Sequence, residues 1–88
     1  MKLDIIYLND IVNELNLQLF ELHGDQDYQF GFVSNGDLQM ITYGSIQLWS
    51  SYEDDRKFDE EEDEYEDLTL FVKRKFNEYT ESLQKIRF

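Results

Sequence analysis

The strongest structural signal in this chain lies in residues 28–49, which read YQFGFVSNGDLQMITYGSIQLW. Apolar and polar residues alternate there in short runs, which is the period of half-buried strands. The pair Asn35-Gly36 suits the two positive φ values of a type I′ turn, and Gly44-Ser45 suits a second two-residue turn. We therefore expect an antiparallel meander.

The two turns also predict the register of that meander. A turn at Asn35-Gly36 pairs Phe30 with Ile41, and a turn at Gly44-Ser45 pairs Ile41 with Leu48. Both registers place the same apolar side chains on one face of the sheet. The members of that face are Tyr28, Phe30, Phe32, Ile41, Tyr43, Ile46 and Leu48.

The residues before the meander predict a short helix within residues 1–16. Its apolar positions follow the i, i+3, i+4, i+7 spacing of one helix face, and Asp4 suits the N-cap. These positions are Leu8, Ile11, Val12 and Leu15. From Leu17 the period changes to two, so residues 17–23 predict a further strand and the sheet would span residues 17–50.

The connection after that strand has two readings. A four-residue loop from Gly24 would place Leu19 on the core face, and a five-residue loop would place Phe20 and Leu22 there. The sequence leaves both open.

The last third of the chain predicts a long helix over residues 59–86. One apolar stripe runs along it at steps of three and four residues, which is enough to cover a small sheet. The stripe consists of Tyr65, Leu68, Val72, Phe76, Tyr79, Leu83 and Ile86. Residues 51–58 would form an acidic connection, in which residues 53–57 are either a turn or a first helix. The expected fold class is α+β, with three or four strands.

Composition limits the function. A chain of 88 residues holds a single domain and has little room for an enclosed active site. A formal net charge of −12 argues against direct binding to nucleic acid or to anionic lipid. The sequence has no cysteine and no run apolar enough for a membrane span, so we expect a cytoplasmic protein.

The charge is concentrated in one segment. Residues 53–67 carry a net charge of −9, residues 1–52 carry −6 and residues 68–88 carry +3. A helix macrodipole uses only two or three charges, each worth about 0.3–1 kcal/mol, whereas residues 59–67 alone hold eight carboxylates. The remaining carboxylates repel one another, which destabilises a helix. The pattern therefore favours a basic partner.

Carboxylates at phosphate-like spacing would compete for the lysines and arginines with which a protein binds nucleic acid. The aromatic residues Tyr52 and Phe58 would supply apolar anchors within this surface. The predicted partner-binding acids are Asp37, Glu53, Asp54, Asp55, Asp59, Glu60, Glu61, Glu62, Asp63, Glu64, Glu66 and Asp67.

Catalytic and metal chemistry have little support. The only histidine, His23, has no nucleophile motif beside it and fits a turn residue. Residues 53–67 contain no glycine, which the calcium loop of an EF-hand requires. We expect no enzyme activity, no cofactor and no metal site.

The layout resembles that of small acidic phage anti-CRISPR proteins, which occupy the PAM-reading cleft of Cas9 as DNA mimics. The likeness rests on residues 9–12 (NDIV) in a first helix, the Asn-Gly turn, residues 52–55 (YEDD) and the acidic run of residues 60–65. It implies that Asp37 and the acids from Glu53 to Asp67 face arginines and lysines of a nuclease. This chain differs from that family in its basic, apolar C-terminal end.

Three functional hypotheses follow. The first is a non-enzymatic inhibitor that blocks a nucleic-acid-binding protein, including a Cas9-like nuclease. The alternative is an immunity protein or antitoxin that neutralises a basic, nuclease-type toxin. A third is an interaction domain that docks or dimerises through Leu70 and Phe71, which lie off the apolar stripe.

Overall fold

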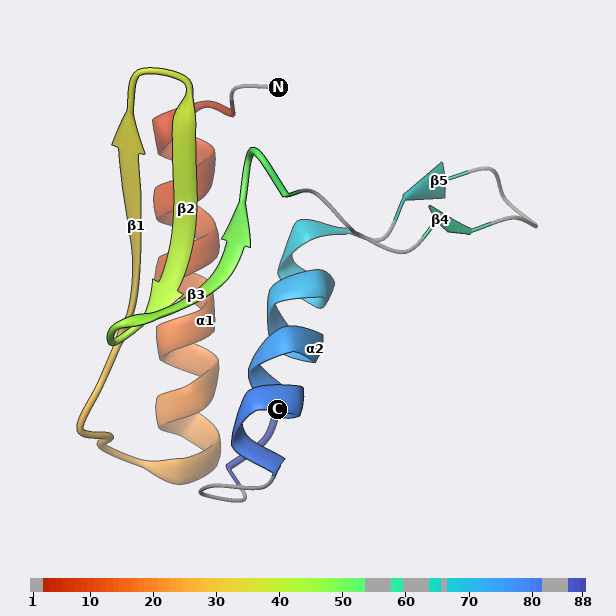
Figure 1. Cartoon of the computed structure of the whole chain (residues 1–88). Helices are drawn as coiled ribbons and strands as arrows, with labels where there is room; N and C mark the ends of the chain where they lie inside the picture. Colours follow the sequence, from red (N-terminus) through yellow and green to blue (C-terminus); the bar gives the residue numbers. More distant parts are fainter. Residues whose placement is uncertain (1–2, 54–57, 60–63, 66, 82–85) are drawn as a thin grey trace.

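The computed structural model describes residues 3–53, 58–59, 64–65, 67–81 and 86–88. The fold is α+β, as predicted: a three-stranded antiparallel sheet of order β1-β2-β3 packs against two helices (Figure 1). The elements are α1 (Ile5–His23), β1 (Phe30–Asn35), β2 (Leu38–Tyr43), β3 (Ile46–Ser50), β4 (Phe58–Asp59), β5 (Glu64–Tyr65) and α2 (Leu68–Glu81). Neither helix has the length and apolarity needed to cross a bilayer, within the residues described.

Helix α1 begins as predicted and ends later than predicted. Asp4 is its N-cap, and the Asp4 carboxylate accepts a hydrogen bond from the Ile6 amide at 2.7 Å. The predicted strand over residues 17–23 is wrong, because the helix continues to His23. Leu19 lies four residues after Leu15, so a continuing helix buries Leu19 on the existing apolar stripe. The two readings of the following loop therefore no longer apply.

The first turn of the meander lies one residue later than predicted. Asn35 pairs with Leu38, so the loop residues are Gly36 and Asp37, and Phe30 pairs with Tyr43. Moving a turn by one residue changes each pairing by two positions, which preserves the side-chain faces. Phe30 is accordingly buried as predicted, whereas Tyr28 precedes the strand and is exposed.

The second turn is confirmed, since Tyr43 pairs with Ile46. The predicted Ile41–Leu48 pair is wrong: a β-bulge makes Trp49 the partner of Ile41. One extra residue at a bulge breaks the alternation of faces, so Leu48 and Trp49 are both buried.

An aromatic cluster joins the sheet to α2. Phe76 is fully buried, with ring centroids 5.2 Å from Phe30 and 4.9 Å from Tyr43. Phe88 packs against the same ring at 5.3 Å. Burial, followed by the nearby charge of Asp27, raises the pKa of Tyr43 above its ordinary value of 10.0. This core tyrosine therefore stays neutral at physiological pH.

Helix α2 is shorter than the predicted 59–86 helix. It begins at Leu68, and Phe58–Asp59 and Glu64–Tyr65 are short strands. The predicted stripe holds for Leu68, Val72 and Phe76, which are all buried; Leu83 lies outside the described residues. Phe71 is also buried, while Leu70 is 56% exposed, so α2 buries a wider face than one stripe. The hypothesis of docking through Phe71 is therefore wrong.

The fully buried Gln39 ties the start of the chain to the sheet. The Gln39 side-chain oxygen accepts from the Leu3 amide, and its nitrogen donates to the Leu3 carbonyl, both at 2.7 Å. The backbone amide of Gln39 donates to Ser51 Oγ at 3.1 Å, and the backbone carbonyl of Gln39 accepts from the Ser51 backbone amide at 2.9 Å. Gln39 thereby also fixes the end of β3, from which the acidic segment departs.

Candidate partner-binding surface

We call residues 53–67 the acidic segment. It leaves the body after β3 and returns at α2, and its two short strands lie apart from the three-stranded sheet (Figure 1). The structure describes Glu53, Asp59, Glu64 and Asp67 among its predicted partner-binding acids. Asp54, Asp55, Glu60, Glu61, Glu62, Asp63 and Glu66 lie outside the described residues.

The departure of the acidic segment is fixed by a turn. The Glu53 amide donates to the Ser50 carbonyl at 3.1 Å, and the Tyr52 amide donates to Ser50 Oγ at 3.2 Å. The exposed Glu53 carboxylate accepts from Gln47 Nε2 at 3.3 Å. The predicted anchor Tyr52 is 70% exposed, so its ring is available to a partner.

Asp37 lies in the exposed loop between β1 and β2, next to this departure point. The Ser51 hydroxyl donates to the Asp37 carbonyl at 2.9 Å. The structure thus brings Asp37 close to the start of the acidic segment, although the two are fourteen residues or more apart in sequence.

The return of the acidic segment is fixed by Asp67, which caps α2. The Asp67 carboxylate accepts from the Thr69 amide at 2.8 Å, and its carbonyl accepts from the Phe71 amide at 2.9 Å. Asp67 therefore has a structural role that the sequence analysis did not assign to it. Its position at the helix N-terminus also suits the macrodipole.

Between the two ends, β4 and β5 pair antiparallel. Phe58, the second predicted anchor, is the register partner of Tyr65, and Asp59 is that of Glu64. Two acids thus occupy directly opposite positions, where like charges disfavour pairing. At the described positions 59 and 64–65, strand pairing therefore replaces the start of the predicted 59–86 helix.

The basic residues of α2 do not lie where they would complement its macrodipole. The last turn of α2 has no basic residue, and Glu78 and Glu81 lie there instead. Lys73, Arg74 and Lys75 lie near the middle of the helix. Arg74 pairs with Glu78 at 3.3 Å, and both Arg74 and Lys75 lie over the Phe71 ring. Their stems therefore cover apolar surface.

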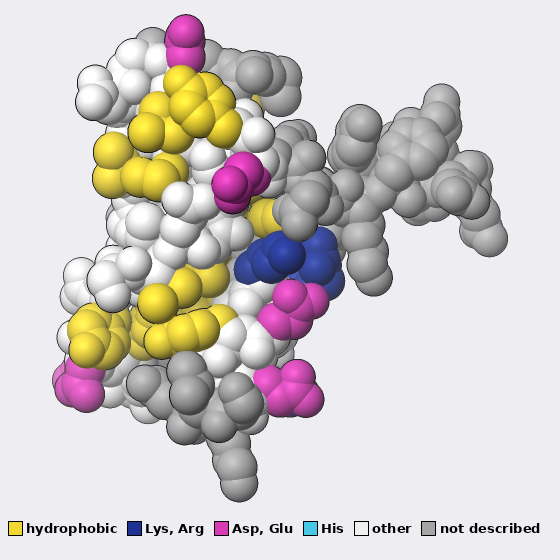
Figure 2. All heavy atoms as spheres, viewed as in Figure 1, with side chains coloured by type: hydrophobic (Ala, Val, Ile, Leu, Met, Phe, Trp, Pro, Cys, Tyr) yellow, Lys and Arg dark blue, Asp and Glu magenta, His cyan; other side chains and the backbone are white. Residues whose placement is uncertain are grey.

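Figure 2 shows one face of the body, where the acidic side chains are scattered between groups of hydrophobic side chains. The dark blue cluster of basic side chains lies beside acidic ones. Within the described residues, no three histidine or acidic side chains are arranged to hold a metal ion.

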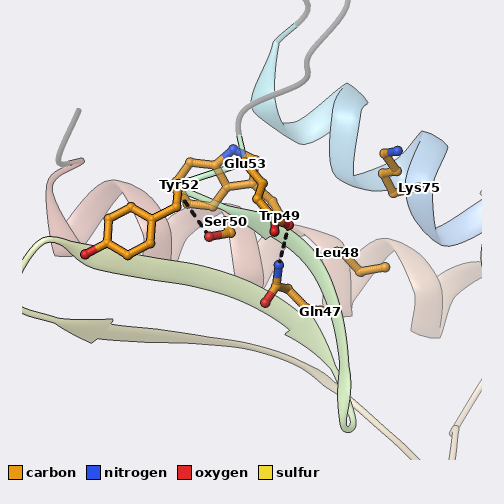
Figure 3. Close-up of a pocket in the computed structure, with 7 residues that line it drawn as sticks. All are labelled: Gln47, Leu48, Trp49, Ser50, Tyr52, Glu53 and Lys75. Carbon is orange, nitrogen blue, oxygen red and sulfur yellow. Dashed lines mark hydrogen bonds between the residues drawn. The ribbon is translucent and has the colours of Figure 1, made fainter.

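A groove of about 540 Å³ lies between β3 and α2 (Figure 3). Residues 47–50 of β3 form one wall, Tyr52 and Glu53 form one end, and Lys75 faces them from α2. The indole nitrogen of Trp49 is buried and has no hydrogen-bond acceptor among the described residues. The sequence analysis missed this groove, because Trp49 read only as the last apolar residue of a strand.

No protein-family model, curated protein or solved structure matches this chain.

Proposed function

We propose that this protein is a non-enzymatic inhibitor that blocks a nucleic-acid-binding protein by presenting carboxylates in place of phosphates. The observation that carries the proposal is the acidic segment: a net charge of −9 within fifteen residues, attached to the folded body at both ends. A segment held at two points loses less conformational freedom on binding than a free tail does.

The geometry of strands is compatible with phosphate mimicry. Asp59 and Glu64 are register partners in β4 and β5, and facing residues of paired strands lie about 5 Å apart. Phosphates along one DNA strand are about 6–7 Å apart, because the strand winds around the axis. The facing positions of Asp59 and Glu64 therefore approach the spacing of two neighbouring phosphates.

The like-charged Asp59–Glu64 pair gives a second argument for a basic partner. Like charges at facing strand positions are unfavourable, and lysines or arginines of a partner at these positions would offset that cost. Binding would then be electrostatically steered, fast, and weaker at high salt.

The test is a competition assay against a labelled DNA duplex. The targets are purified Cas9–guide RNA complex, other nucleases, a repressor and a nuclease toxin. We expect the wild-type protein to displace DNA from at least one target, with an affinity that falls steeply as salt rises. If the protein inhibits the nuclease toxin and none of the other targets, it is an immunity protein or antitoxin. If DNA is displaced from none of them, the proposal fails.

A matched pair of variants separates a local effect from net charge. The first reverses four acids of the acidic segment, with Glu60, Glu61, Asp63 and Glu64 changed to Lys. The control reverses four exposed acids of the body, with Asp10, Glu14, Glu21 and Asp25 changed to Lys. Both variants change the net charge equally. Only the first should lose inhibition, and an equal loss in both would contradict mimicry by the acidic segment.

A further inference from the structure

The starting observation is a buried donor without an acceptor. Trp49 is 4% exposed, and its Nε1–H has no hydrogen-bond partner among the described residues. Buried donors are nearly always paired in folded proteins, so an unpaired one calls for a physical reason. Figure 3 places the Trp49 ring among the residues that line the β3–α2 groove.

The groove runs along an unpaired strand edge. Among the strands that the structure describes, β3 has a neighbour, β2, on one side only. The residues from Gln47 to Ser50 that line the groove are consecutive along this edge. An edge strand leaves alternate backbone N–H and C=O groups without a ladder partner.

The charged groups around the groove favour a basic side chain at one end. The Glu53 carboxylate is exposed and, among the described residues, accepts one hydrogen bond, from Gln47, which leaves room for a further donor. On the opposite wall, the Lys75 ammonium lies 5.6 Å from the centre of the Phe71 ring. A cation in the groove would therefore be drawn to the Glu53 end.

We propose that the β3–α2 groove binds an extended polypeptide segment, which adds to the free edge of β3 and places a backbone carbonyl on Trp49 Nε1–H. A basic side chain of this segment would lie against Glu53. Strand addition of this kind obtains affinity from backbone hydrogen bonds and specificity from the side chains between them.

A polypeptide strand fits these groups better than a small anion does. An anion on the Trp49 donor would lie close to the Glu53 carboxylate, which repels it. A strand supplies neutral carbonyl acceptors and N–H donors at regular spacing, which matches both the indole and the strand edge.

This proposal does not rest on phosphate mimicry, because only Glu53 belongs both to the groove and to the acidic segment. The groove lies where the acidic segment leaves the body, so a partner bound to the acids could provide the strand. The experiment uses peptides alone, and its outcome is therefore separate from that of the DNA competition assay.

The test uses the single tryptophan as a reporter. The probe is an acetylated, amidated peptide, Thr-Val-Arg-Val-Thr, titrated to millimolar concentration into the ¹⁵N-labelled protein. Two matched controls carry N-methyl groups, one on both valines and the other on the arginine and both threonines. Since only alternate peptide amides face β3, one control should bind like the parent and the other should bind at least about tenfold more weakly.

The expected spectroscopic result is a downfield shift of the one indole N–H signal, together with shifts of the Gln47–Ser50 amides. Three results would each overturn the proposal. One is no shift with the parent peptide, and another is equal binding of the two methylated controls. The third is an indole signal that changes with protein concentration alone, since a second copy would then occupy the groove.

Two variants assign the contacts, with labelled-peptide anisotropy as the readout. Trp49→Phe keeps an aromatic ring and removes the donor, so affinity should fall about five- to tenfold. Glu53→Gln should weaken the arginine peptide by a similar factor, and should leave a peptide with glutamine in place of arginine unaffected. Unchanged arginine-peptide affinity in Glu53→Gln would contradict the proposed charge contact, even if Trp49→Phe does not fold.

Discussion

The body of the molecule and the acidic segment follow different physical rules. Helices α1 and α2 and the strands β1–β3 supply the buried core residues that the structure describes. The acidic segment contributes two strands of two residues each and three quarters of the net charge. Side-chain packing therefore stabilises the body, whereas charge is the main property of the acidic segment. Substitutions in the body should change folding stability strongly by altering packing. Substitutions in the acidic segment should change it weakly by altering repulsion between charges.

The largest expected effect is on the core of the body. Phe76→Ala removes a fully buried ring that touches Phe30, Tyr43 and Phe88, and should lower the free energy of unfolding by about 3–5 kcal/mol. The matched control is Leu70→Ala, on the exposed face of the same helix, which should change it by less than about 0.5 kcal/mol. Urea denaturation measures both. Similar losses in the two variants would contradict this assignment of faces.

A smaller effect is expected at the polar link within the body. Gln39→Leu keeps the volume but leaves the Leu3 amide and carbonyl without their partners, at a cost of about 1–3 kcal/mol. The Leu3 amide should also exchange faster with solvent, which NMR detects. Gln18→Leu is the control, because Gln18 bonds only to the neighbouring Glu14 side chain on the helix surface. A stability change below about 0.5 kcal/mol in Gln39→Leu would show that the link is dispensable.

The smallest effect is expected in the acidic segment. Changing Glu60, Glu61 and Glu64 to Gln and Asp63 to Asn lowers the negative charge by four without reversing it. Reduced self-repulsion should raise the free energy of unfolding by a few tenths of a kcal/mol at low salt, and the gain should vanish at high salt. Thermal denaturation at two salt concentrations measures the difference. A loss larger than about 1 kcal/mol would instead give these acids a structural role.

The sequence predicted features that depend on neighbouring residues. The Asp4 cap, the α1 stripe from Leu8 to Leu15 and the turn at Gly44-Ser45 all match the structure. Each is a local pattern, since capping and helix periodicity involve residues only a few positions apart.

Features that depend on competition between distant parts were predicted less well. The alternating residues 17–23 suit a strand by themselves, but a helix that already buries Leu15 gains more by burying Leu19 as well. Residues 59 and 64–65 read as the start of a long helix, yet Asp67 caps α2, and Phe58–Asp59 pairs with Glu64–Tyr65 as strands. Helix formation among so many like charges is opposed by repulsion between successive turns.

The acids were found from sequence because charge is visible in composition, whereas the groove was not. The bulge that turns Trp49 toward Ile41 exists only when β3 is paired with β2. The free edge of β3 exists only once the sheet order is fixed.

The amino-acid sequence by itself therefore determined the fold class, the local caps and turns, and the place where negative charge accumulates. Tertiary structure decided where the helices end, which strand lies at the edge, and that a tryptophan donor is buried without an acceptor among the described residues. The reason is physical: charge and periodicity are properties of short segments, while burial and strand order arise only when distant segments compete for the same core.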